Sequence, residues 1–123
     1  MNRFDLEERL IDFSVLIIEI ANEMPHTPAG LHLAGQIIRS GTSVSLNYGE
    51  TQGGESRKDF IHKMKIGLKE LRETYICLKI IYRAKLYNNE EKIIRAIKEC
   101  NELISIFVRS IETARKNLKT NNQ

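Results

Sequence analysis

Hydrophobic residues recur at spacings of three and four along most of this chain, and such spacing places them on one face of an α-helix. Within residues 5–24 the recurring positions are Leu6, Leu10, Phe13, Ile17, Ile20 and Met24. Residues 25–28, with the sequence PHTP, interrupt the pattern. Threonine before proline is typical of a helix start, because the hydroxyl caps a free backbone N–H and proline has none to lose. The pattern predicts one helix over residues 5–24 and a second from residue 29.

The strictest repeat lies in the last third of the chain, where apolar residues alternate spacings of four and three. They are Ile93, Ile97, Cys100, Ile104, Phe107, Ile111, Ala114 and Leu118. Such a heptad seam predicts a helix over residues 90–118, and residues 119–123 are expected to fray. Four more apolar residues lie beyond the seam: Ile94, Leu103, Ile106 and Val108. We therefore expect this helix to bury two faces, one in its own bundle and one against a partner.

A further helix is predicted over residues 56–86. Ser56 with Asp59 three residues later resembles a capping box. Its inward positions are Ile61, Met64, Leu68, Leu71, Tyr75, Leu78 and Tyr82. Four long helices with short connections predict an all-α fold, a single-domain antiparallel up-down four-helix bundle over residues 1–123.

Small residues fill the segment from Arg39 to Glu50, with the sequence RSGTSVSLNYGE. It has neither the GxGxxG spacing nor the Gly-Lys-Ser/Thr sequence of phosphate-binding loops. Gly41 and Gly49 are a little over two helical turns apart, so a helix places them near one face. Glycine costs about 1 kcal/mol per helical site relative to alanine, and close packing would offset that cost. We interpret residues 29–52 as a helix that approaches a neighbour closely; a loop is the alternative.

Composition favours a single-domain globular protein without a membrane span or a secretory signal. The 123 residues suffice for one domain with a core. No apolar run reaches the roughly 18 residues of a membrane span, and the charged start MNRFDLEERL is unlike a secretory signal. Cys77 and Cys100 lie within apolar helical patterns, which favours reduced core thiols over a disulfide. The expected compartment is the cytoplasm.

Charge is unevenly distributed along the chain. Residues 1–24 contain two basic and six acidic residues, whereas residues 55–86 contain nine basic and four acidic residues. Within the second segment, basic residues follow one face of the predicted helix: Lys58, Lys65, Lys69, Arg72, Lys79 and Arg83. We call these six residues the basic stripe. It is either an ordinary solvated face or a surface that contacts phosphates by charge rather than by base readout.

The remaining polar residues give no pattern typical of a metal site or a catalytic site. Arg39, Asn47 and Glu50 are placed to form a polar network with Glu73, either as a structural network that fixes helix register or as a ligand contact. Asp59 and His62 give only one of the two Glu-x-x-His-like pairs that a di-iron bundle needs, so no metal or cofactor is expected. No nucleophile–base arrangement is evident, and we expect no enzymatic activity.

The segment from Gln36 to Thr74 resembles the family of four-helix bundle proteins described as large-subunit ribosomal RNA intervening-sequence proteins. The matching positions are Gln36, Arg39, Thr42, Ser43, Val44, Asn47, Glu50, Ser56, Arg57, Asp59, Phe60, Glu73 and Thr74. Where the family usually has Ile-Ala-Glu-Gly, this chain has Tyr48-Gly49-Glu50-Thr51.

The resemblance implies an antiparallel four-helix bundle and a ring-like homo-oligomer, a pentamer, in the bacterial cytoplasm. Family members are encoded within intervening sequences of ribosomal RNA genes. A related branch serves diversity-generating retroelements as an accessory protein thought to bind nucleic acid and reverse transcriptase. Two function classes therefore stand at this stage: an accessory protein that binds RNA, DNA or a ribonucleoprotein, and a self-assembling scaffold that binds proteins.

Overall fold

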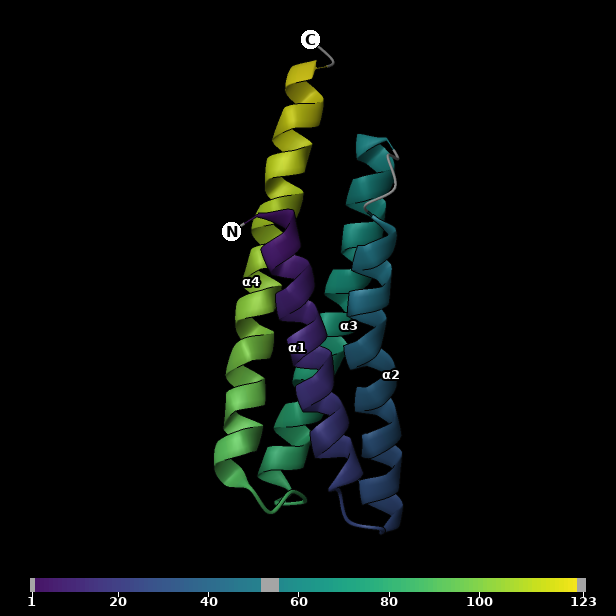
Figure 1. Ribbon diagram of the computed structural model, residues 1–123, viewed down its shortest axis with the longest axis vertical. Helices are drawn as coiled ribbons and strands as arrows, with labels where there is room; N and C mark the ends of the chain where they lie inside the picture. Colours follow the sequence, from purple (N-terminus) through teal and green to yellow (C-terminus); the bar gives the residue numbers. More distant parts are fainter. Residues whose placement is uncertain (1, 52–55, 122–123) are drawn as a thin grey trace.

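The computed structural model describes residues 2–51 and 56–121, which form four α-helices and no strand. The helices are α1 (Arg3–Asn22), α2 (Pro28–Glu50), α3 (Arg57–Arg83) and α4 (Glu90–Asn121). Each helix packs against two others: α1 and α3 both contact α2 and α4. The α1–α2 and α3–α4 connections lie at the same end of the bundle (Figure 1). The predicted all-α four-helix bundle is confirmed.

Helix starts follow the polar residues that cap them. Asn2 and Asp5 form a capping box, which starts α1 two residues earlier than predicted. Thr27 accepts a hydrogen bond from the Gly30 N–H at 3.1 Å, as its position before proline indicated. Ser56 accepts from the Asp59 N–H at 3.2 Å. These side chains satisfy backbone donors that the first turn of a helix leaves free.

Three predicted helix ends were wrong. The helix predicted to reach residue 24 stops at Asn22. The helix predicted to reach residue 86 stops at Arg83, because Lys85 adopts a left-handed backbone with φ of 54° and the chain reverses there. The tail predicted to fray from residue 119 instead continues as helix to Asn121. Leu118 still packs against the core near that end and supports the last turns. Gln52, the predicted last residue of the second helix, lies outside the described residues.

The predicted inward faces of α1 and α4 are confirmed. Every recurring apolar residue of α1 is buried, as is Met24 just past its end. The α4 seam is buried or half-buried along its length. On α3 the prediction holds as far as Leu78, but Tyr82 is 38% exposed and Ile81 is buried in its place. A repeat of seven residues drifts by about 20° per heptad on a straight helix, so the buried face has moved by the last turn.

The bundle itself covers part of the expected second apolar face of α4, and contact of that face with a partner stays a prediction. Leu103 is fully buried within the bundle itself, and Ile94, Ile106 and Val108 are half-buried. The large hydrophobic side chains that the described residues expose belong to the other three helices. They are Phe4, Ile11, Val15 and Ile18 on α1, Leu31, Ile38 and Leu46 on α2, and Ile66, Ile76, Ile80 and Tyr82 on α3.

The small-residue segment is helical, so the loop alternative was wrong. A Cβ added to Gly41 would lie 3.0 Å from Ile17 Cγ2, tighter than ordinary van der Waals contact. The Ser14 hydroxyl lies 3.3 Å from the Gly41 carbonyl and 2.6 Å from the Ser45 hydroxyl. Close approach of α1 and α2 is thus confirmed at Gly41. It does not extend to Gly49, where an added Cβ would meet open space.

Within the described ranges, none of the helices combines the length and the apolar character that crossing a membrane requires.

Candidate nucleic-acid interface

The basic stripe lies on the outer surface of α3. Five of its members are exposed, and the sixth, Lys79, is half-buried with its ammonium 5.0 Å from the centre of the Tyr75 ring. The aromatic face attracts the cation and holds the lysine stem against the helix. From Lys58 to Arg83 the stripe covers about 37 Å at the rise of an α-helix.

The acidic residues in the middle of α3 are turned away from this surface. Arg39 of α2 contacts the Glu70 carboxylate at 3.3 Å and pairs with Glu73 as well. It also donates a hydrogen bond to the Gln36 side-chain oxygen at 3.3 Å. One guanidinium therefore pairs with two carboxylates on the flank of α3 that faces α2.

Buried hydroxyls set the position of this network. Ser40 and Thr74 are both fully buried, and their hydroxyls lie 2.7 Å apart between α2 and α3. The Thr74 hydroxyl also lies 2.8 Å from the Glu70 carbonyl, and the Ser40 hydroxyl donates to the Gln36 carbonyl at 3.0 Å. The residues that carry these carbonyls are the same ones whose side chains meet Arg39. The hydroxyl pair fixes the register that brings the charged groups together.

The structure brings together Gln36, Arg39 and Glu73 of the predicted polar network. The structure adds Glu70 to this network. Glu70 lies three residues before Glu73, and this spacing places both on one face of a helix. Asn47 is half-buried on α2, two turns beyond Arg39, and makes no hydrogen bond to these residues in the described structure. The Glu50 side chain lies outside the described part.

The result is a separation of charge across α3. Within residues 2–51 and 56–121, none of the exposed members of the basic stripe takes part in an ion pair. Glu70 and Glu73 form no ion pair with the stripe, because both carboxylates are turned toward Arg39. An unpaired row of exposed cations is chemically suited to hold phosphate oxygens by charge.

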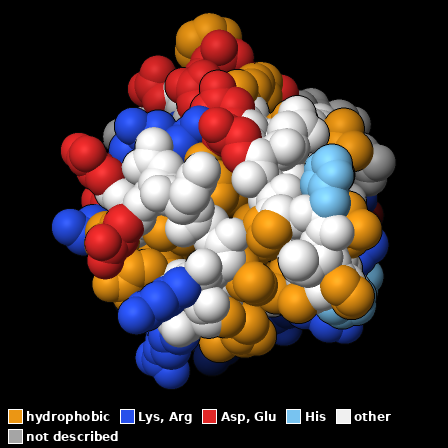
Figure 2. Space-filling model, turned by 90° about the horizontal axis from the view of Figure 1, so that it is seen from below, with side chains coloured by type: hydrophobic (Ala, Val, Ile, Leu, Met, Phe, Trp, Pro, Cys, Tyr) orange, Lys and Arg blue, Asp and Glu red, His pale blue; other side chains and the backbone are white. Residues whose placement is uncertain are grey.

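Acidic and hydrophobic side chains are also separated at the end of the bundle that carries the α1–α2 and α3–α4 connections. Figure 2 shows acidic side chains gathered along one side of that end and hydrophobic side chains over much of the opposite side. The acidic residues of α1 include Glu19, which pairs with Lys92 of α4 at 3.3 Å. Glu23, just past the end of α1, pairs with the same lysine at 3.2 Å and accepts a hydrogen bond from the Tyr87 hydroxyl at 2.6 Å.

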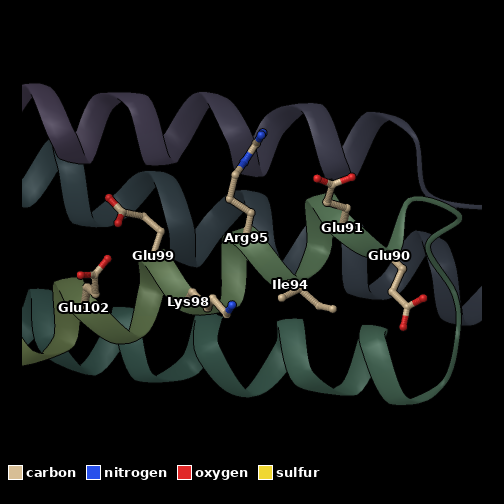
Figure 3. Close-up of a pocket in the computed structure, with 7 residues that line it drawn as sticks. All are labelled: Glu90, Glu91, Ile94, Arg95, Lys98, Glu99 and Glu102. Carbon is tan, nitrogen blue, oxygen red and sulfur yellow. The ribbon is translucent and has the colours of Figure 1, made fainter.

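A pocket on the outer surface of α4 differs from the basic stripe in its charge. Its lining residues all belong to α4: Glu90, Glu91, Ile94, Arg95, Lys98, Glu99 and Glu102. Glu91, Arg95 and Glu99 extend toward α1, whereas Glu90 and Ile94 lie on the side of α3 (Figure 3). Carboxylates and cations alternate along the pocket, so it presents no surface of a single sign.

Thiol and metal chemistry gain no support. Both cysteines are free, and Cys100 is buried with its thiol donating to the Leu71 carbonyl at 3.3 Å. Burial raises the pKa of Cys100 to about 12 and raises the pKa of Cys77 as well, so neither is a reactive thiolate near neutral pH. In the described part of the chain, no three potential metal ligands come together.

Comparison with known proteins identifies relatives of this fold. Residues 3–109 match the family described as 23S rRNA-intervening sequence protein. A crystal structure from Bacteroides thetaiotaomicron, described as a protein of unknown function from the S23 ribosomal protein family, superposes with a TM-score of 0.81. Its sequence is 27% identical, and the alignment covers 91% of this chain and 99% of the other. No curated protein matches. The family resemblance seen in the sequence is confirmed, and the chain belongs to the 23S rRNA-intervening sequence protein family.

Proposed function

We propose that this protein is a non-enzymatic accessory protein that binds the phosphodiester backbone of RNA or DNA, alone or in a ribonucleoprotein, through the basic stripe of α3. The observation that carries the proposal is the separation of charge on that helix. Arg39 engages Glu70 and Glu73, and the exposed cations of the stripe have no acidic partner among the described residues. Membership of an rRNA-related family supports RNA as a ligand.

The stripe favours weak binding that tolerates any sequence. Lysine and arginine on a helix surface contact phosphates without reading base edges, so they contribute affinity but little specificity. Non-specific binding of this kind has dissociation constants of about 10⁻⁴–10⁻⁶ M at physiological salt. In this proposal Gln36, Arg39 and Glu73 hold α2 and α3 in register and do not touch the ligand; Asn47 and Glu50 belong to the same region of α2.

The proposed working form is an antiparallel up-down bundle that assembles into a closed homo-oligomeric ring, a pentamer, in the bacterial cytoplasm. The hydrophobic side chains exposed on α1, α2 and α3 support self-association, because burying them against another copy removes apolar surface from water. The acidic first segment and the basic third segment add electrostatic complementarity between copies. A ring multiplies weak phosphate contacts by avidity.

A self-assembling scaffold that binds only proteins is the second candidate. The specific observation in its favour is the same exposed apolar surface, which includes Val15 at 50% exposure and Leu46 at 70%. Light scattering tests the assembly common to both candidates. A monodisperse monomer at micromolar concentration contradicts it. Replacing Val15 by glutamate is expected to shift the population toward smaller species.

Fluorescence anisotropy of labelled RNA and DNA at two salt concentrations tests the binding function. The variant K65Q/K69Q/R72Q removes three exposed charges from the stripe and is expected to lower both affinity and salt dependence. The matched control, R95Q/K98Q/R109Q, removes three exposed charges from α4. Both variants should melt close to the wild type, because exposed charges contribute little to stability. Wild-type protein that fails to bind at low salt, or a stripe variant that binds fully, favours the scaffold.

A further inference from the structure

The C-terminal part of α4 extends beyond the first turn of α1 (Figure 1). From Arg109 to Lys119 it carries four basic residues and one acidic residue, Glu112. Ile111 and Ala114 are buried and Leu118 is half-buried, so this part of α4 remains attached to the bundle core. Ile61, near the start of α3, belongs to the same core.

Three contacts fix the register of α4 against α3. An added Cβ at Gly67 would meet Phe107, the Cys100 thiol meets the Leu71 carbonyl, and the Tyr82 hydroxyl lies 3.3 Å from Glu90. Numbers rise along α3 as they fall along α4. Lys58 lies nine residues before Gly67, and Arg115 lies eight residues after Phe107. At 1.5 Å per residue these distances are about 13 Å and about 12 Å, so Lys58 and Arg115 share a level.

Helical geometry also gives the flank on which the α4 cations lie. Glu90 contacts Tyr82, so its flank of α4 faces α3. Lys119 is 29 residues beyond Glu90, close to eight full turns of about 3.6 residues, and returns to that flank. Arg115 is five turns beyond Ile97, which is half-buried on the same flank.

Arg109 lies on a different flank. It is two turns beyond Glu102, whose carboxylate pairs with Arg9 of α1 at 3.1 Å. Lys98 lies close to the Arg109 direction, since a separation of eleven residues makes about three turns. Both side chains are exposed. Arg109 and Lys98 are therefore cations of the same helix that point outward from the bundle and do not share the flank of Glu90.

We propose that Arg115 and Lys119 of α4 extend the phosphate-binding surface, so that a nucleic-acid strand lies across the edge shared by α3 and α4 and contacts Lys58 and Lys65 from one helix and Arg115 and Lys119 from the other. This inference rests on the proposed function of the basic stripe. Both α4 residues are exposed and form no ion pair within residues 2–51 and 56–121.

Glu112 is the opposing charge at this edge. It is exposed, lies three residues before Arg115, and forms no ion pair with it in the described structure. Its carboxylate repels a phosphate that passes close to α4. Replacing Glu112 by glutamine should therefore tighten binding, whereas the same change removes nothing that the bundle needs.

The test compares two double variants with equal loss of charge: R115Q/K119Q and the control K98Q/R109Q. Probes are a single-stranded RNA of about 16 nucleotides, the same length of single-stranded DNA, and the RNA duplex. These probes share the phosphodiester backbone and identify which polymer the surface holds. Loss of two phosphate contacts is expected to lower the slope of log affinity against log salt by about 1.4–1.8. The control should retain the wild-type slope.

The two proposals fail in different ways. Wild-type protein that binds none of the probes at low salt overturns the function proposed for the basic stripe. Wild-type binding that R115Q/K119Q retains with unchanged affinity and slope overturns only the extension onto α4. An equal loss in both double variants also overturns the extension, since net charge alone then explains the effect. Thermal melts of each variant establish that it is folded.

Discussion

Helix α1 meets its two neighbours through different kinds of contact. Against α2 it packs closely, with Ile17 over Gly41 and the Ser14 hydroxyl bonded across the seam. Against α4 it is held at the rim by ion pairs, in which Arg9 contacts Glu99 through two nitrogens, each at 2.7 Å. The first seam depends on the shape of buried groups, whereas the second depends on charges in contact with water. Close packing should resist salt and pH but tolerate little change in volume, and the charged seam should behave in the opposite way.

The largest expected effect comes from a bulky side chain in the close seam. Gly41→Leu should destabilise the bundle by about 1–3 kcal/mol, because Ile17 occupies the space the new side chain needs. Thermal melts measure the loss. Gly35→Ala is the matched control on α2, since an added Cβ there meets nothing within 4 Å. It should gain up to about 1 kcal/mol from helix propensity. An unchanged melting temperature for Gly41→Leu would show that the seam is not tightly packed.

A smaller effect is expected at the hydroxyl pair between α2 and α3. Thr74→Val keeps the side-chain shape but removes the group that lies 2.7 Å from the Ser40 hydroxyl. The loss should be about 1 kcal/mol, because Ser40 keeps its bond to the Gln36 carbonyl. Denaturant unfolding measures it, with Thr42→Val as the control at a half-buried hydroxyl that bonds only within α2. Equal losses would mean that the contact between helices contributes nothing of its own.

The charged seam should respond less. Arg9→Met keeps the aliphatic stem and removes the pairs with Glu99 and Glu102. The guanidinium is partly exposed, so the cost should be about 0.5–1 kcal/mol at low salt and should shrink as salt is added. Melts at two salt concentrations measure both quantities. A cost that does not change with salt would place this seam in the same class as the α1–α2 seam.

The smallest effect concerns pH. The Tyr87 hydroxyl, and then Lys92, lower the pKa of Glu23 below its ordinary value of 4.5. The folded state therefore favours the carboxylate, and its contribution is present above pH 4.5 and is lost as pH falls through the lowered pKa. The difference in melting temperature between wild type and Glu23→Gln should be greatest near neutral pH and vanish in acid. The Glu23 carboxylate is exposed, so the difference in melting temperature should be small. A difference that grows as pH falls would mean that folding raises the pKa of Glu23 instead of lowering it.

Hydrophobic spacing predicted the helices because each buried face repeats with the period of the helix itself. The faces of α1 and α4 were therefore accessible from the sequence, as were the caps at Thr27 and Ser56. The sequence did not show which element of the fold, if any, covers the remaining apolar residues of each helix. Ile94 and Val108 look like a second interface in the sequence, yet both are already half-buried within the bundle. Burial at such positions depends on how neighbouring helices are displaced, which spacing does not encode.

The candidate interface shows a similar limit. Its cations were visible in the sequence because they repeat along one face of a helix. Whether Glu70 and Glu73 neutralise them depended on the rotation of α3 against α2, which the buried Ser40–Thr74 contact sets. Arg115 and Lys119 gave no signal, since a fourfold excess of basic residues at the end of a helix is common. Only the register of α4 against α3 places Arg115 at the level of Lys58, with Lys119 about one turn beyond it.

The seam between α1 and α4 also has a consequence for the order of events in folding. Arg9 and Glu99 are 90 positions apart in the chain, whereas Ser14 and Gly41 are 27 apart. Closing the longer loop costs more chain entropy, and contacts of low sequence separation form sooner. The α1–α2 pair should therefore assemble early and the contact with α4 late. In native-state hydrogen exchange the edge between α1 and α4 should open first, since it combines late closure with contacts at the solvent.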